Sequence, residues 1–143
     1  MAWLEAIKAR FKPVPDIAGD MEAARLAAAT GDYAAALAVW GPLAQAGVPR
    51  AQNNIGACFV EGWGVERDLA LAVRWLTLAA EAGDRPGQRN LAALYFKGDG
   101  VEQDYAKAAE LYRLAAEAGD AAAQDMLSWM LMEGEVMPPD LTE

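Results

Sequence analysis

The sequence AQNNIGACFVEGWGVERDLALAVRWLTLAAEAGDRP at residues 51–86 decides the fold, because the chain repeats it immediately. Residues 87–122 read GQRNLAALYFKGDGVEQDYAKAAELYRLAAEAGDAA, and roughly half of the aligned positions are identical, mainly Gly, Ala, Val and Asp. A sequence that matches itself at a fixed spacing of about 20–50 residues is typical of a stacked repeat protein. The chain is therefore predicted to stack similar units along an axis.

Each copy contains a short corner in which two glycines flank one residue and are followed by Val, with an Asp three residues later. A Leu-Ala-Ala-Glu-Ala-Gly-Asp run then closes each copy. These segments are 62–65, Asp68 and 78–84 in the first copy, and 98–101, Asp104 and 114–120 in the second. Over about residues 20–134 the pattern resembles the Sel-one-like repeat family, which is related to the tetratricopeptide repeat. The repeat of that family has 36 residues, which is also the spacing between the two copies in this chain. The resemblance implies an all-α fold, a right-handed α-solenoid of antiparallel helix pairs.

Aspartates in this pattern are predicted to begin the helices. Asp68 and Asp104 stand where a helix N-cap is expected, and Asp84 and Asp120 occupy the same position before the following helices. An N-cap Asp accepts hydrogen bonds from free backbone N–H groups and stabilises the positive end of the helix dipole. We therefore interpret these four aspartates as caps rather than as metal ligands or acid–base groups.

Residues 17–50 are predicted to form a shorter helix hairpin ahead of the two long copies. Segments 21–29 and 33–46 read as Ala-rich helices joined by a turn at 31–32. Alanine is the best helix former, and its small side chain lets paired helices approach closely. Gly47 is expected to end the second helix, and Pro49 suits the first turn of the next helix because its missing N–H is harmless there.

Residues 1–15 are predicted to form an amphipathic helix and a proline linker, separate from a solenoid over 16–136. Trp3, Leu4, Ile7 and Phe11 fall on one helical face. Charges interrupt the apolar positions, which argues against a secretory signal, and no run of about 18 apolar residues predicts an integral membrane segment. Three uses stay open for this helix, namely capping the first repeat, docking onto a partner protein, and weak peripheral contact with a membrane.

A third copy begins at residue 121 and is incomplete over 121–136, and residues 137–143 are predicted to be a flexible tail. Its helix has an apolar face but lacks the second helix that follows in the earlier copies. A terminal repeat normally needs a polar outer surface. The residues of this face are Met126, Leu127, Met130 and Leu131, with Trp129 and Met132 beside them. A homodimer formed through this helix is one predicted interaction.

The composition argues against several classes of function. A net charge of −9 opposes binding to nucleic-acid phosphates and broad adhesion to anionic lipid. The chain has no histidine, which removes the commonest zinc ligand and the usual general base, so no metal or cofactor is predicted. Cys58 is the only cysteine, so an intramolecular disulfide cannot form, which fits a cytoplasmic location. Its apolar register indicates a small buried side chain.

In tetratricopeptide-like folds the first helix of each pair lines the concave surface, and the resemblance implies that this surface binds peptides or proteins. Aligning the three copies places an equivalent set of four residues on it from each copy. The sets differ between copies whereas the Gly and Ala framework does not, which is typical of a contact surface; the alternative interpretation is solvated helix positions. The sets are Asn53, Ala57, Val60 and Glu61, then Arg89, Ala93, Phe96 and Lys97, then Asp125, Trp129, Met132 and Glu133.

The sequence favours a non-enzymatic adaptor that binds a protein or peptide partner through its concave face. The alternative is a self-associating module that uses its C-terminal helix. A hydrolase is a remote third hypothesis, since cysteine-rich relatives in this family have been linked to hydrolysis of β-lactams. Their helix pairs carry disulfides, whereas this chain has one cysteine, and no base stands beside its only serine, Ser128. No catalytic residue is therefore predicted.

Overall fold

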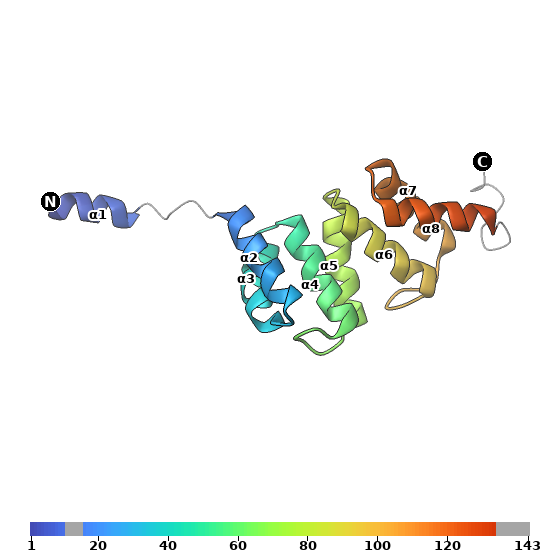
Figure 1. The fold of residues 1–143 in the computed structure, drawn as a ribbon, viewed down its shortest axis with the longest axis horizontal. Coiled ribbons are helices and arrows are strands. Elements are labelled where there is room, and N and C mark those ends of the chain that lie inside the picture. Colours follow the sequence, from blue (N-terminus) through green and yellow to red (C-terminus); the bar gives the residue numbers. More distant parts are fainter. Residues whose placement is uncertain (11–15, 134–143) are drawn as a thin grey trace.

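The computed structural model describes residues 1–10 and 16–133, and all regular structure in this part of the chain is helical (Figure 1). The predicted all-α fold is confirmed. Helices α2 to α7 each contain 13 residues. The helices are α1 (Ala2–Arg10), α2 (Ile17–Ala29), α3 (Tyr33–Gln45), α4 (Pro49–Glu61), α5 (Leu69–Glu81), α6 (Arg85–Lys97), α7 (Tyr105–Glu117) and α8 (Ala121–Met132).

The helices from α2 onward form a solenoid. Each packs against the next along the chain, and Figure 1 shows the pairs arranged along one long axis rather than around a closed centre. The pairs are α2–α3, α4–α5 and α6–α7, followed by α8 alone. The first helices α4 and α6 also contact each other, more closely than α5 approaches α7. This closer spacing puts the first helices on the inner side of the curve.

Six of these helices begin at an aspartate whose carboxylate accepts a hydrogen bond from the backbone N–H three residues later, at 2.9–3.1 Å. These N-caps are Asp16, Asp32, Asp68, Asp84, Asp104 and Asp120. The four caps predicted from the sequence are confirmed. Helix α4 differs, because Val48 precedes it and makes no side-chain cap, although Pro49 stands at its first turn as predicted.

The two glycine corners have nearly the same geometry. Gly62 and Gly64 have φ of 74°, and Gly98 and Gly100 have φ of 75° and 72°. In each corner the backbone N–H of the capping aspartate donates to a carbonyl near the end of the preceding helix at 2.9 Å, from Asp68 to Phe59 and from Asp104 to Tyr95. The corner thus returns the chain to start its second helix against the end of the first.

Among the residues that the structure describes, the hydrophobic core has two parts. Trp40, Ile55 and Cys58 belong to the part formed with α2, α3 and α4, and Leu76 and Met130 belong to the part that extends from α5 to α8. Cys58 is buried, and its burial raises the pKa of the thiol to about 11. The prediction of a small buried cysteine side chain is confirmed.

Only part of the apolar face of α8 is buried against the rest of the solenoid. Met130 is fully buried, and Met126 and Leu127 pack partly buried against the same core. Trp129, Leu131 and Met132 remain exposed by 44%, 39% and 84%. The side of α8 that turns away from α7 therefore stays apolar in the described part of the chain.

Helix α1 is drawn at the N-terminal end of the molecule, away from the helix pairs (Figure 1). Trp3 and Ile7 are exposed and Leu4 is half-buried. Phe11, the linker over 11–15 and the tail over 137–143 lie outside the described residues. The domain boundaries and the docking role of this helix therefore remain predictions.

Candidate partner-binding groove

A groove of about 380 Å³ lies between α4 and α6, the first helices of successive pairs. Its floor contains small and apolar side chains, and charged groups stand at its edge. The lining residues are Ala57, Val60, Glu61, Trp63, Asn90, Ala93, Leu94, Lys97 and Asp99. Of the predicted contact residues, the structure brings Val60, Glu61 and Lys97 together here, with Ala57 and Ala93 between them.

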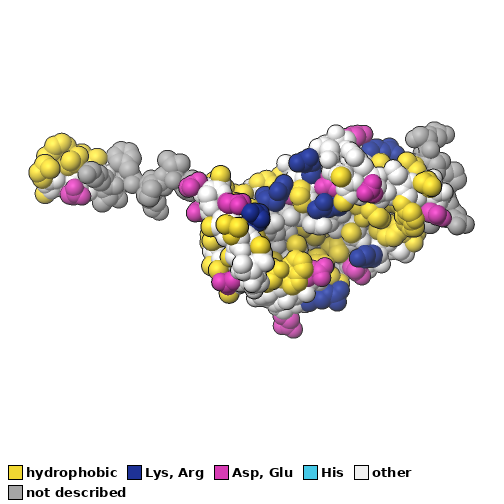
Figure 2. Space-filling model, viewed as in Figure 1, with side chains coloured by type: hydrophobic (Ala, Val, Ile, Leu, Met, Phe, Trp, Pro, Cys, Tyr) yellow, Lys and Arg dark blue, Asp and Glu magenta, His cyan; other side chains and the backbone are white. Residues whose placement is uncertain are grey.

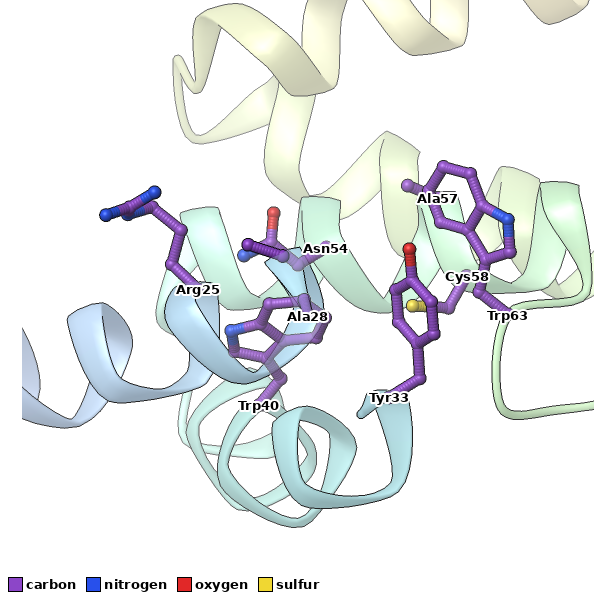
Figure 3. A pocket seen from close by; sticks show the side chains of 9 residues that line it. Arg25, Ala28, Tyr33, Trp40, Asn54, Ala57, Cys58 and Trp63 are labelled. Atoms are coloured by element: carbon purple, nitrogen blue, oxygen red, sulfur yellow. The ribbon is translucent and has the colours of Figure 1, made fainter. Parts of the chain in front are cut away.

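A second pocket of about 320 Å³ continues the groove toward α2. Figure 3 shows its side chains, in which Tyr33 lies between Trp40 and Trp63 in the view. The pocket is lined by Arg25, Ala28, Ala29, Tyr33, Trp40, Asn54, Ala57, Cys58 and Trp63. Ala57 and Trp63 belong to both linings, so the two spaces adjoin. In Figure 2, hydrophobic atoms line the hollow at the middle of the molecule, with charged side chains around it.

Trp63 is the aromatic residue that the sequence interpretation missed. It stands inside the first glycine corner, where the second copy has Asp99, and 43% of it is exposed. Its ring stacks on Tyr33 with centroids 5.3 Å apart and planes 17° apart. The signal available in the sequence was a tryptophan between two loop glycines, because a residue at such a position is not needed to fill the core between the helices.

Asn53 and Asn90 connect the first helices. Asn90 Nδ2 donates to Asn53 Oδ1 at 2.8 Å, and Asn53 is only 5% exposed. A buried amide must be hydrogen-bonded to offset its desolvation. The sequence placed Asn53 among the partner contacts, but the structure uses its side chain to join α4 to α6 and leaves little of it for a partner.

Arg89 and Phe96 also contact neighbouring helices. Arg89 Nη1 lies 3.0 Å from Asp120 Oδ2, and this carboxylate is the N-cap of α8. The ring of Phe96 meets Tyr105 and Trp129 edge-to-face, with centroids 5.3 Å and 5.8 Å apart. These two predicted contact residues hold α6 to α7 and α8, so replacing them would alter the stacking of the repeats as well as the surface.

The predicted residues of α8 do not join the groove. Asp125, Trp129 and Met132 are exposed, and none of them lines either of the two spaces described above. They form a separate surface toward the C-terminal end of the solenoid. The twelve predicted contact residues are thus divided among a groove, a set of packing positions and this end surface.

Within 1–10 and 16–133, no cluster of three or more Cys, Asp or Glu side chains is placed to hold a metal ion. Over the same residues, no helix has the length and apolar character needed to cross a bilayer.

Comparison with known proteins identifies the family. The sequence model of the Sel1 repeat matches residues 49–84, 85–120 and 121–143. The chain belongs to the Sel1 repeat family. The first two matches coincide with α4–α5 and α6–α7 and their corners, and the third begins with α8. Sel1 repeat proteins are generally scaffolds for protein interaction.

Solved structures of Sel1 repeat proteins have the same fold. The c5321 protective antigen of uropathogenic Escherichia coli, which displays an SLR fold, is 36% identical with a TM-score of 0.73, over 82% of this chain and 26% of that one. This chain thus spans about a quarter of that relative. A Sel1 repeat protein from Oxalobacter formigenes is 33% identical with a TM-score of 0.68, over 79% and 88% of the two chains.

Cysteine-rich protein B of Helicobacter pylori shares the fold at lower similarity. It is 16% identical with a TM-score of 0.62, over 78% of this chain and 95% of that one. Among curated proteins, none matches this sequence.

Proposed function

We propose that this Sel1 repeat protein is a non-enzymatic scaffold that holds a peptide or protein partner in the groove between α4 and α6. The observation that carries the proposal is the groove itself, about 380 Å³ in volume, on the side where successive first helices meet. Ligand sites in proteins are usually concave and mainly apolar with a few polar groups, and their volumes run from about 300 to 1,000 Å³. The groove has these properties.

The differences between copies support the same surface. Glu61 becomes Lys97 in the second copy, and Trp63 becomes Asp99, all four lining the groove, whereas the capping aspartates and corner glycines keep their identity. Folding requires the caps and corners, so they cannot vary freely. The groove positions carry side chains of different size and charge, as expected of a surface that fits a particular partner.

The charges at the edge indicate a partner with a mixed polar border. Glu61 is the last residue of α4, Lys97 is the last residue of α6 and Asp99 follows in the corner, so the three stand at the same end of the groove. Two are acidic and one is basic, so a strongly anionic ligand such as nucleic acid would meet repulsion there. An uncharged apolar segment flanked by polar residues fits this lining better.

Two nucleophile candidates give little support to a hydrolase. Burial raises the pKa of Cys58 to about 11, so its thiol is protonated near neutral pH and is a poor nucleophile. Ser128 is exposed on α8, away from the groove lining.

Since the chain has one cysteine, we also propose a cytoplasmic location, where thiols stay reduced.

Peptide selection tests the groove directly. A phage-displayed peptide library is selected on the immobilised chain, and the dissociation constant of a selected synthetic peptide is measured by calorimetry. We expect Ala93→Arg, which fills the groove, and Lys97→Glu, which reverses an edge charge, to weaken binding at least tenfold, about 1.4 kcal/mol. Arg113→Glu, exposed on α7 outside the groove, is the matched control. Unchanged affinity in both groove variants would place the binding surface elsewhere.

Self-association through α8 is a second candidate function. The exposed Trp129, Leu131 and Met132 favour it, because contiguous exposed apolar side chains mark interaction sites. We expect the weight-average mass from sedimentation equilibrium to rise with concentration in the wild type and to stay monomeric in Trp129→Glu. A wild-type chain that is monomeric at the highest concentration measured would contradict this candidate.

A further inference from the structure

The pocket between α2 and α4 contains a buried hydrogen-bond donor without an acceptor. Trp40 is 6% exposed, and its Nε1 makes no hydrogen bond to any described residue. In Figure 3 the nitrogen lies on the side of the indole ring nearest Arg25. A buried donor left unpaired costs free energy that a ligand acceptor would recover. The other buried side-chain atom without a partner among the described residues is Gln88 Oε1, an acceptor in a residue that lines neither space, whereas Trp40 lines a pocket that an acceptor from outside the chain can enter.

Asn54 offers a second donor beside it. Its Oδ1 accepts from Asn53 Nδ2 at 3.2 Å, while its Nδ2 has no acceptor among the described residues. Asn54 is half-buried and lines the same pocket as Trp40. The walls of the pocket therefore contain two N–H donors that have no acceptor among the described residues, the indole of Trp40 and the amide of Asn54.

The remaining walls are apolar. The Tyr33–Trp63 stack closes one side, and the small side chains of Ala28, Ala29 and Ala57 leave the space open. A volume of about 320 Å³ is at the lower end of the range of roughly 300–1,000 Å³ for ligand pockets. This size fits one bulky side chain together with its peptide group.

Charge decides between a neutral and an anionic acceptor. The cation in the lining is Arg25, and its guanidinium is already paired with Glu22, with nitrogen–oxygen distances of 2.7 and 2.9 Å. The chain as a whole carries a net charge of −9. A carboxylate ligand would find no unpaired cation in the pocket and an unfavourable surrounding field. A backbone carbonyl has the required acceptor without the charge.

We propose that this pocket binds one bulky apolar residue of a peptide, whose backbone carbonyl accepts a hydrogen bond from Trp40 Nε1. The inference rests on the proposed function, since the pocket adjoins the α4–α6 groove through Ala57 and Trp63. It adds the position of an anchor residue and the chemistry that recognises it. The peptide enters along the groove and places its apolar anchor beside the Tyr33–Trp63 stack.

Nuclear magnetic resonance of the full chain tests the proposal with N-acetyl-leucine N-methylamide as the probe. We expect the Trp40 indole N–H resonance, assigned by its loss in Trp40→Phe, to shift downfield saturably on titration. The indole resonance of Trp129, which lies outside the pocket, serves as the internal control and stays in place. A Trp40 resonance that does not move up to the solubility limit of the probe would overturn the proposal.

Variants separate the hydrogen bond from the apolar contact. Trp40→Phe keeps an aromatic ring but removes the donor, so we expect the probe to bind about fivefold more weakly. Trp63→Ala removes an exposed wall and is expected to weaken binding at least tenfold, and Trp129→Ala is expected to change nothing. Equal affinity of a folded Trp40→Phe variant, or tighter binding of N-acetyl-leucine as its free carboxylate, would overturn the assignment of the neutral carbonyl. If Trp40→Phe does not fold, Tyr33→Ala is decisive, because Tyr33 lines the pocket and not the groove; unchanged probe affinity in that variant would overturn the proposal.

The same spectra distinguish this inference from the proposed function. Probe-induced shifts at the backbone amides of Ala93 and Lys97, without a shift at Trp40, would leave the groove as the binding site and refute the Trp40 pocket. Shifts confined to the pocket, together with full peptide affinity in Ala93→Arg, would instead refute the groove.

Discussion

Gly100→Ala is expected to destabilise the protein by about 3 kcal/mol, the sum of left-handed backbone strain and a steric clash with a neighbouring backbone. Gly100 has φ of 72°, and a Cβ added there would lie 2.7 Å from the carbonyl oxygen of Leu69 and 2.9 Å from its carbonyl carbon. Leu69 is the first residue of α5, so the corner of one repeat rests on the backbone of the previous one. Backbone atoms cannot rotate away as a flexible side chain can.

Gly83→Ala is the matched control for this change. Gly83 also has a positive φ, of 86°, but a Cβ there would meet no atom within 4 Å. We expect only the conformational strain, about 1 kcal/mol. Urea denaturation followed by circular dichroism measures both variants. Equal loss of stability in the two would mean that the corner of the second copy does not press on α5.

Leu76→Ala is expected to cost about 3 kcal/mol, because Leu76 is fully buried and its truncation leaves a cavity. Leu76 lies against Gly56, where an added Cβ would be 2.7 Å from Leu76 Cγ and 2.8 Å from Cδ2. This close approach lets α4 and α5 pack as a pair. Gly56→Ala alone is therefore expected to destabilise by about 1–3 kcal/mol through overpacking.

Combining the two substitutions tests whether they share one space. In the double variant Gly56→Ala/Leu76→Ala, the new methyl group enters the volume that the leucine atoms have left. We expect the double variant to be more stable than the sum of the single effects predicts, with an interaction of at least about 1 kcal/mol. Additive effects in the urea midpoints would contradict the packing at this contact.

The repeat and its boundaries could be predicted from the sequence because they depend on local chemistry. An aspartate before an Ala-rich run caps a helix whatever the helix contacts, as Asp84 and Asp120 do here. Glycines in a corner adopt positive φ for the same local reason. Because the sequence repeats every 36 residues, the same caps and corners recur along the chain. The solenoid could therefore be predicted without knowing any long-range contact.

The candidate site was predicted less completely, because helical register identifies a face and says nothing of what covers it. Asn53 and Arg89 stand on the predicted face, yet Asn90 and Asp120 reach them from other helices. The pocket around Trp40 depends on three helices and a corner that the sequence separates by many residues. An unpaired indole N–H inside that pocket is visible only once the helices have been placed.

The side-chain contacts that join one helix pair to the next differ between junctions. At the α5–α6 and α7–α8 junctions, a capping aspartate also pairs with an arginine from the previous first helix, Arg50 with Asp84 and Arg89 with Asp120. At the α3–α4 junction Val48 replaces that aspartate, although Gln52 Nε2 still donates to the Ala44 carbonyl. Among the described residues this is the least secured junction. A peptide anchored beside Trp40 and extended toward Lys97 would bridge it, so occupancy would raise the melting temperature by holding the first hairpin in place.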